Sequence, residues 1–182
     1  MKTSPLRGFT LFLTGLAGAG KTTIAQRVNE LLLDEYWRTV TILDGEVVRE
    51  MVSSGLTFSR ADRELNIRRI GYVAGEITRH GGICIAAAIA PFRVARADVR
   101  ARIGALGAYY EIHVATPLAE CEKRDPKGLY RMARQGLVKN VPGVDAVYEE
   151  PEKPELRIDT SFLSVEEEAR QVLQLPVRDG LL

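Results

Sequence analysis

The chain has 182 residues, of which 46% are hydrophobic and 27% charged, and its formal net charge is +1 at pH 7. These values are typical of one globular domain, so we expect residues 1–182 to form a single unit. A net charge near zero gives no general attraction to nucleic acid or to an anionic membrane, and no apolar run approaches membrane-spanning length. The sequence has no secretory hydrophobic segment, and its two cysteines lack metal-ligand spacing. We therefore expect a cytoplasmic protein with free thiols.

Short apolar runs alternate along the chain with segments of helical periodicity. After a lead-in without regular structure over residues 1–8, the expected strands are 9–14, 39–43, 83–89, 109–116 and 156–159. The expected helices are 21–36, 46–52, 59–80, 94–105, 118–124, 129–134 and 165–173. Such alternation predicts a three-layer αβα fold around a five-stranded parallel sheet.

Three expectations concern particular parts of this pattern. Ser59 is the expected N-cap of the helix 59–80. Trp37 and the Tyr109–Tyr110 pair are expected to pack in the interior. Residues 125–155 form a long charged connection with one short helix, and connections of this length are usually functional, so we expect a lid.

A phosphate-binding motif lies between the first expected strand and the first expected helix. Gly15–Thr22 fits G-x-x-x-x-G-K-[ST], in which glycines let backbone N–H groups surround phosphate oxygens. The lysine of the motif can reach the β- and γ-phosphates, and the Thr22 hydroxyl can ligate Mg²⁺. The motif and its flanks predict a nucleoside triphosphate site formed by Gly15, Ala17, Gly18, Ala19, Gly20, Lys21, Thr22 and Thr23.

Asp44 ends the second expected strand, so its carboxylate should face the same edge of the sheet as the phosphate loop. There it can accept a proton from a substrate hydroxyl or hold Mg²⁺ through water. Alternatively, it caps the helix 46–52, and the two roles are compatible. The third expected strand ends without a carboxylate, which favours a chemical role for Asp44.

Cations gather in two further segments. The helix 59–80 carries Arg60, Arg63, Arg68 and Arg69 within about three turns, and arginine forks suit phosphate or sulfate. Alternatively, these arginines form a solvated face that pairs with Asp62 and Glu64. Arg124 and Lys127 open the expected lid, where cations can screen developing charge. Surface charge without function is the alternative there.

The ordered series of motifs resembles the adenylylsulfate (APS) kinases over about residues 9–175. The matching segments are Gly15–Thr22, Leu43–Arg49, Gly55–Ile70, Pro91–Arg93, Cys121–Arg134, Gly143–Asp145 and Tyr148–Pro151. The resemblance implies a P-loop kinase of nucleoside-monophosphate-kinase architecture. Its reaction would transfer the γ-phosphate of ATP, with Mg²⁺, to the 3′-hydroxyl of adenylylsulfate. The resemblance also implies a homodimer, either free-standing or joined to ATP sulfurylase.

The same resemblance implies roles for individual residues. Asp44 and Lys21 would be catalytic, with Asp44 positioning or deprotonating the acceptor hydroxyl, and Arg124 would join the ATP site. The implied adenylylsulfate contacts are Asp44, Arg49, Phe58, Arg63, Asn66, Ile89, Lys127, Lys139, Asn140 and Val141. Phe58 would stack on the adenine of the acceptor.

Three positions depart from the family pattern. Ala90 stands where the family commonly has serine, so a phosphoenzyme cannot form there and direct transfer is expected. Glu46 replaces the second aspartate of an Asp-Gly-Asp motif and reaches one methylene further. Val141 replaces an aromatic residue, which removes one face of an adenine sandwich.

Two other hypotheses remain open at this stage. The chain could be another small-molecule P-loop kinase with a different hydroxyl acceptor, or a non-catalytic nucleotide-binding domain of a sulfurylase. Lys21, Thr22 and Asp44 are all present, and together they favour a catalytic domain.

Overall fold

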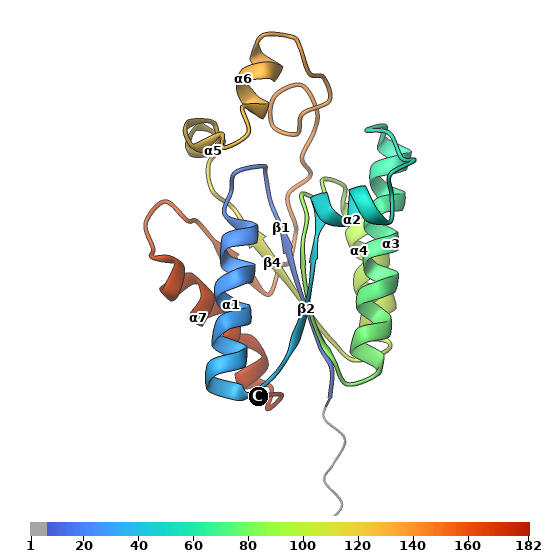
Figure 1. The fold of residues 1–182 in the computed structure, drawn as a ribbon, viewed down its shortest axis with the longest axis vertical. Coiled ribbons are helices and arrows are strands. Elements are labelled where there is room, and N and C mark those ends of the chain that lie inside the picture. Colours follow the sequence, from blue (N-terminus) through green and yellow to red (C-terminus); the bar gives the residue numbers. More distant parts are fainter. Residues whose placement is uncertain (1–6) are drawn as a thin grey trace, which may run out of the picture.

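The computed structural model describes residues 7–182, so most of the lead-in expected over residues 1–8 lies outside the described part. A central sheet is covered by helices on both faces (Figure 1). Its strands are β1 (Phe9–Thr14), β2 (Val40–Asp44), β3 (Ile83–Ala87), β4 (Ala108–Val114) and β5 (Leu156–Ile158). They are all parallel and lie in the order β2-β3-β1-β4-β5. The predicted three-layer αβα fold is confirmed.

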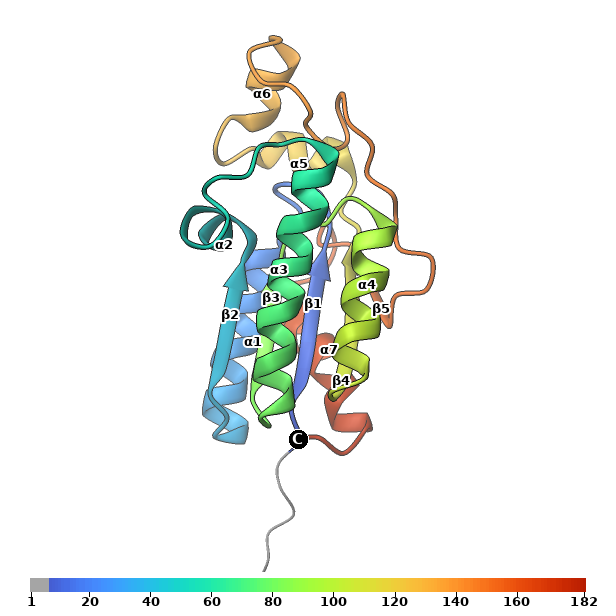
Figure 2. The same ribbon diagram turned by 90° about the vertical axis from the view of Figure 1, so that its right-hand side faces the viewer.

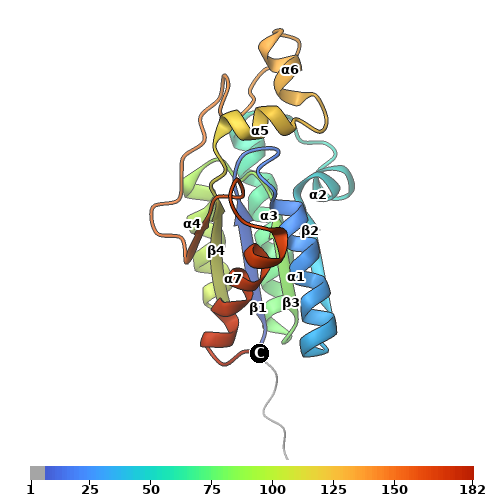
Figure 3. The same cartoon turned by 90° about the vertical axis from the view of Figure 1, so that its left-hand side faces the viewer.

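Seven helices connect or follow the strands in the described part of the chain. They are α1 (Lys21–Tyr36), α2 (Gly45–Met51), α3 (Arg60–Arg79), α4 (Arg93–Gly104), α5 (Leu118–Arg124), α6 (Leu129–Arg134) and α7 (Val165–Arg178). Helices α3 and α4 cover one face of the sheet (Figure 2), and α1 and α7 cover the other (Figure 3). Residues 125–155, the segment expected to be a lid and here called the lid, include α6, which projects beyond the carboxyl ends of the strands (Figure 1).

The core explains why four of the six residues of β1 are apolar. Leu11 and Leu13 pack toward α1 and α7, whereas Phe12 packs toward α3 and α4. Alternate residues of a strand point to opposite faces, so a strand covered on both sides carries few polar side chains, and the buried hydroxyls of Thr10 and Thr14 are hydrogen-bonded. All six residues of β1 are buried, which places the loop that follows it on a rigid base.

Helices α3 and α4 approach each other closely at a glycine. A Cβ atom added to Gly71 would lie 2.5 Å from Cγ2 of Val99. No side chain fits at that distance, so the glycine permits the close packing of these two helices. This packing supports the face of the sheet that carries one wall of the site described below.

The sequence expectations fail at two places. Trp37 is 87% exposed rather than buried, because it is the C-cap of α1 in the left-handed conformation, with its N–H donated to the carbonyl of Leu32. Helix α7 continues to Arg178 instead of ending at residue 173, and it accommodates Pro176, which is buried, within its last turn. The other boundaries agree within two residues, which is the usual uncertainty of helix and strand ends.

Several smaller expectations are confirmed. Ser59 caps α3 by accepting the N–H of Asp62, and Tyr109 and Tyr110 are buried. Cys84 and Cys121 are free and buried. Across residues 7–182, none of the helices combines the length and the hydropathy that a membrane span requires.

Candidate active site

The phosphate loop leaves the carboxyl end of β1 and turns into α1. Gly18 and Gly20 have φ values of 71° and 106°, a region that glycine enters without strain. Gly20 is the N-cap of α1 and supplies no side-chain cap, so the first amides of the helix remain available to an anion. Free amides and the positive end of the helix dipole together form an anion site.

Lys21 is nearly buried, with 8% of its surface exposed. Its Nζ donates to the carbonyl of Gly15 at 2.9 Å and to that of Leu16 at 2.7 Å. Burial lowers the pKa of Lys21 to about 8, although the nearby Cys121, Asp44 and Glu46 act in the opposite direction. The ammonium is therefore held within the loop by carbonyl groups, in a setting that favours an anionic ligand.

Asp44 caps α2, which is one of the roles expected from its position, and it also contacts Thr22. Its Oδ1 accepts the N–H of Glu46 at 2.9 Å and so caps α2, while its Oδ2 accepts the hydroxyl of Thr22 at 2.8 Å. Hydroxyl and carboxylate oxygens are hard ligands that suit Mg²⁺. In phosphate-binding sites Mg²⁺ is usually held by one or two such protein groups together with phosphate oxygens. The residues present therefore fit a magnesium ion.

A pocket of about 690 Å³, here called the phosphate-loop pocket, lies over this loop. Its volume is typical of a small-molecule site. The predicted residues that line it are Ala17, Gly18, Gly20, Lys21, Thr22, Thr23, Asp44 and Arg124. Gly15 and Ala19 do not line it: the carbonyl of Gly15 binds Lys21, and Ala19 is fully buried.

A second pocket of about 650 Å³, here called the α3 pocket, lies between α2, α3, the end of β3 and the lid. Its walls include every residue assigned by resemblance to the acceptor, apart from Asp44: Arg49, Phe58, Arg63, Asn66, Ile89, Lys127, Lys139, Asn140 and Val141. Those residues come from segments that are distant in sequence. The two pockets share Gly45, Glu46, Ala88, Ile89, Lys127 and Leu129, so they adjoin.

Positive charge and an aromatic ring meet in the α3 pocket. The guanidinium carbons of Arg49 and Arg63 lie 4.8 Å and 5.1 Å from the centroid of Phe58, whose side chain is exposed. Burial lowers the pKa of Arg63, and repulsion from Arg49 lowers it further. An anion between the two arginines would offset both effects, because its charge stabilises the charged guanidinium groups.

Asn66 adds a polar atom to the same pocket. Its side chain is buried, and its Oδ1 has no hydrogen-bond partner within the described part of the chain. A buried acceptor without a partner is unfavourable, so this oxygen suits an N–H or O–H donor of a ligand.

Two of the remaining arginines of α3 pair with Glu64, as the alternative interpretation expects, whereas Arg69 binds a backbone carbonyl. Arg60 pairs with Glu64, Arg68 pairs with Glu64 and Asp98, and Arg69 donates to the carbonyl of Val52. Only Arg63 of the four lines the α3 pocket. Helical spacing alone could not separate it from the others.

Several contacts hold the lid near the site, among them the hydrogen bond from Nη2 of Arg63 to the carbonyl of Asn140 at 2.7 Å. Lys127 forms an ion pair with Glu46, and both side chains are exposed where the two pockets adjoin. Tyr130 of α6 donates its hydroxyl to the carbonyl of Ala17 at 2.8 Å. The lid in this structure thus touches both the phosphate loop and α2.

Sequence reasoning missed residues that act through backbone atoms. Arg124 donates to the hydroxyl of Thr160 at 2.7 Å and to its carbonyl at 3.0 Å. The Thr160 hydroxyl also contacts the carbonyl of Ala19 at 3.1 Å. Thr160 therefore fixes Arg124 beside the phosphate loop, and no motif in the sequence identified it.

Comparison with known proteins identifies relatives of this chain. Residues 7–159 match the family described as adenylylsulphate kinase. An adenylyl-sulfate kinase from Synechococcus sp. is 48% identical over 168 residues, which cover 92% of this chain and 94% of the relative. A sulfate adenylyltransferase from Chaetomium globosum is 47% identical over 176 residues, and this chain spans 31% of its length.

Solved structures give the same result and link it to the fold. An APS kinase from Mycobacterium tuberculosis in complex with AMPPNP and APS superposes with a TM-score of 0.90 at 38% identity, over 94% of this chain and 98% of the other. A hexameric APS kinase from Thiobacillus denitrificans superposes with a TM-score of 0.75 at 44% identity. The match covers 98% of this chain and 30% of the other. By sequence and by fold, the chain belongs to the adenylylsulfate kinase family of ATP-dependent P-loop kinases.

Proposed function

We propose that this chain transfers the γ-phosphate of ATP to the 3′-hydroxyl of adenylylsulfate, giving ADP and 3′-phosphoadenylylsulfate. The observation that carries the proposal is the composition of the α3 pocket. It gathers all the acceptor residues assigned by resemblance other than Asp44, and it adjoins the phosphate-loop pocket. Family membership and the likeness to an APS kinase bound to AMPPNP and APS support the same activity.

In this proposal the phosphate loop binds the triphosphate through its amides and Lys21, and Arg124 contacts the same nucleotide. Thr22 and Asp44 would hold Mg²⁺, which would neutralise phosphate charge. Asp44 then positions the 3′-hydroxyl and accepts its proton as the oxygen attacks the γ-phosphorus. The new O–P bond forms as the bond to ADP breaks.

The α3 pocket supplies the acceptor contacts in the proposal. Phe58 stacks on the adenine, while Arg49 and Arg63 balance the negative charge of adenylylsulfate. The lid residues Lys139, Asn140 and Val141 cover the acceptor. Val141 offers an apolar surface without a ring, so Phe58 provides the aromatic contact alone.

Because Ala90 has no hydroxyl, we propose transfer in a single step without a phosphoenzyme at this position. We also propose a cytoplasmic homodimer. The support for an assembly lies in relatives: one solved APS kinase is described as hexameric, and the fungal relatives are longer sulfate adenylyltransferases. Sedimentation of the purified chain would measure its state.

The test is release of ADP from ATP with adenylylsulfate, compared with other hydroxyl acceptors. Asp44→Ala should lower kcat by about 100-fold or more while the KM for ATP changes far less, because Thr22 and the phosphates of ATP can still bind Mg²⁺. Asp98→Ala is the control, since Asp98 pairs with Arg68 outside both pockets.

Each outcome bears on a different part of the proposal. If both nucleotides bind but adenylylsulfate does not raise ADP release above the background rate, the chain is better explained as a regulatory domain. That result would refute the proposed activity. Faster release with another hydroxyl would reassign the acceptor. Normal turnover by Asp44→Ala would refute the role of that carboxylate.

A further inference from the structure

The wall of the α3 pocket contains a backbone conformation that alanine rarely adopts. Ile89, Ala90 and Pro91 all line the pocket, and Ala90 has a φ of 46°. A residue with a Cβ atom remains in this region only where its surroundings hold it. The question is therefore which contacts fix the turn at Ala90.

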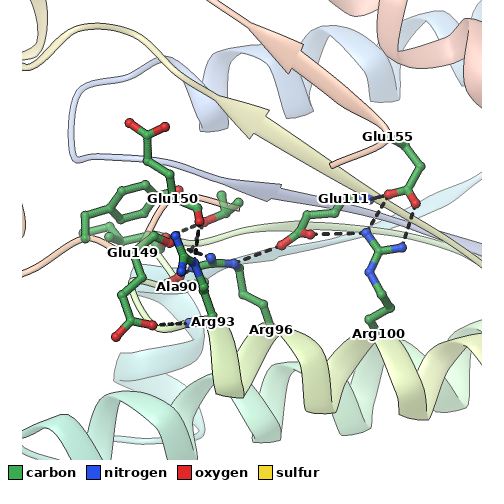
Figure 4. A network of polar contacts seen from close by, with 11 residues as sticks. Ala90, Arg93, Arg96, Arg100, Glu111, Glu149, Glu150 and Glu155 are labelled. Carbon is green, nitrogen blue, oxygen red and sulfur yellow. Dashed lines mark hydrogen bonds and ion pairs between the residues drawn. The ribbon is translucent and has the colours of Figure 1, made fainter. Parts of the chain in front are cut away.

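The Thr14 hydroxyl donates to the carbonyl of Ile89 at 2.6 Å, and Arg96 on α4 makes the shorter side-chain contact to Ala90 itself. Its Nη1 donates to the carbonyl of Ala90 at 2.5 Å, and its Nη2 donates to the carbonyl of Glu149 at 2.5 Å (Figure 4). The side chain is only 3% exposed, and its Nε lies 3.0 Å from Oε1 of Glu111 as an ion pair. One planar guanidinium thus joins the pocket wall to a second segment of the chain.

That second segment, residues 148–150, is where the lid returns toward the sheet and is here called the return segment. The N–H of Glu149 donates to the carbonyl of Pro91 at 2.8 Å, and the Glu149 carboxylate accepts the N–H of Arg93 at 2.8 Å. The hydroxyls of Tyr148 and Thr14 lie 3.0 Å apart. The return segment is therefore held against the Ala90 turn and the end of β1.

We propose that Arg96 is a positioning residue for the α3 pocket, because it holds the Ala90 turn and the return segment in one fixed arrangement. Arg96 does not line either pocket, so it acts through backbone atoms and not by touching a ligand. The identity of the ligand, adenylylsulfate, rests on the function proposed above. The positioning of the Ala90 turn by Arg96 does not depend on that function.

A purely structural role is the competing explanation, since Arg96 also neutralises the buried Glu111. The neighbouring turn of α4 provides a matched control. Arg100 pairs with the same Glu111 at 3.2 Å and with Glu155 at 2.6 Å, but it contacts neither the Ala90 turn nor the return segment (Figure 4). Replacing Arg100 therefore weakens an ion pair on the same helix while the contacts to the Ala90 turn and the return segment stay in place.

The experiment compares Arg96→Lys with Arg100→Lys in the full chain. A lysine can keep the charge opposite Glu111, but a single ammonium cannot span two carbonyls in the fork geometry of arginine. Arg96→Lys should raise the KM for adenylylsulfate about tenfold and leave the KM for ATP within about twofold. Arg100→Lys should change neither KM, even where both variants lose similar thermal stability.

Hydrogen exchange gives a readout that needs no turnover. The amide of Glu149 should exchange about tenfold faster in Arg96→Lys than in Arg100→Lys, because only the former releases the return segment. Should Arg96→Lys fail to fold, Arg96→Gln is the second variant, because one glutamine amide cannot hold both carbonyls as the guanidinium does. It should raise the KM for adenylylsulfate in the same direction.

These arms separate the two proposals. An unmodified chain that gives no turnover with adenylylsulfate refutes the proposed function, while the exchange of the Glu149 amide still tests Arg96. Equal exchange rates in the two lysine variants would overturn the positioning role. Equal changes in both KM values, or no change in Arg96→Lys and Arg96→Gln, would also overturn it.

Discussion

His113 on β4 is buried against the ring of Tyr148, with ring centroids 5.8 Å apart. Burial lowers the pKa of His113 to about 4, mainly because the charged imidazolium would lose its hydration. The ring therefore stays neutral in the folded protein over a pH range where the unfolded chain takes up a proton. Because of this difference in proton binding, the stability of the packing between His113 and Tyr148 of the return segment should depend on pH.

The first prediction follows from the sign of that difference. With a folded pKa near 4 and an ordinary value of 6.5, the unfolded state binds more protons between these limits. The contribution of His113 to the free energy of unfolding should be fully present above pH 6.5. It should fall by up to about 3 kcal/mol as the pH decreases toward 4. Urea unfolding across this window should show a flatter dependence in His113→Phe. The exposed His80, changed to Gln, should keep the slope of the unmodified chain.

The second prediction separates the two partners of the ion pair between lid and α2. Lys127 lines both pockets and can meet the transferred phosphate, so Lys127→Met should lower kcat/KM by about 100-fold. Glu46→Gln should stay within about threefold, because an exposed ion pair contributes little by itself. Steady-state assays with adenylylsulfate make the comparison. Equal losses in both variants would mean that the pair acts as a latch and that Lys127 does not serve the substrate.

Among the elements, α3 and α4 show how helix packing supports the site. Gly71 permits their close approach, and α4 in turn presents Arg96 to the pocket wall. The third prediction is that Gly71→Ala destabilises the protein by about 1–3 kcal/mol, although alanine is the better helix former. Gly104 in α4 has no atom within 4 Å of an added Cβ, so Gly104→Ala should be neutral or slightly stabilising. Thermal unfolding of the two variants tests this prediction. An unchanged stability of Gly71→Ala would contradict it and would show that the helices separate at little cost.

At the scale of the whole molecule, the two adjoining pockets and the lid form one site at the carboxyl ends of the strands. The fourth prediction concerns its ligands. AMPPNP with Mg²⁺, at 100 times its Kd, should raise the free energy of unfolding by about 2.7 kcal/mol. Chelation of the metal should remove most of that gain and leave the effect of adenylylsulfate unchanged. An AMPPNP effect that survives chelation would contradict the assignment of Thr22 and Asp44 as metal-holding residues.

How far the sequence could predict this molecule depends on the range of the interactions. The phosphate loop and β1 were predictable because their signal lies in consecutive residues. The α3 pocket joins segments from α2 to the lid, and only the family resemblance connected them before the structure did. Arg96 and Thr160 act on backbone carbonyls, which leave no side-chain pattern to detect.

The exposed Trp37 has a practical consequence for optical experiments. It is the single tryptophan of the chain and caps α1 at the end opposite the lid (Figure 1). Its indole is already in water in the folded state, so its emission should shift little when the chain unfolds or binds nucleotide. Circular dichroism is the better probe of unfolding here. The same insensitivity makes Trp37 a steady internal reference for protein concentration during ligand titrations.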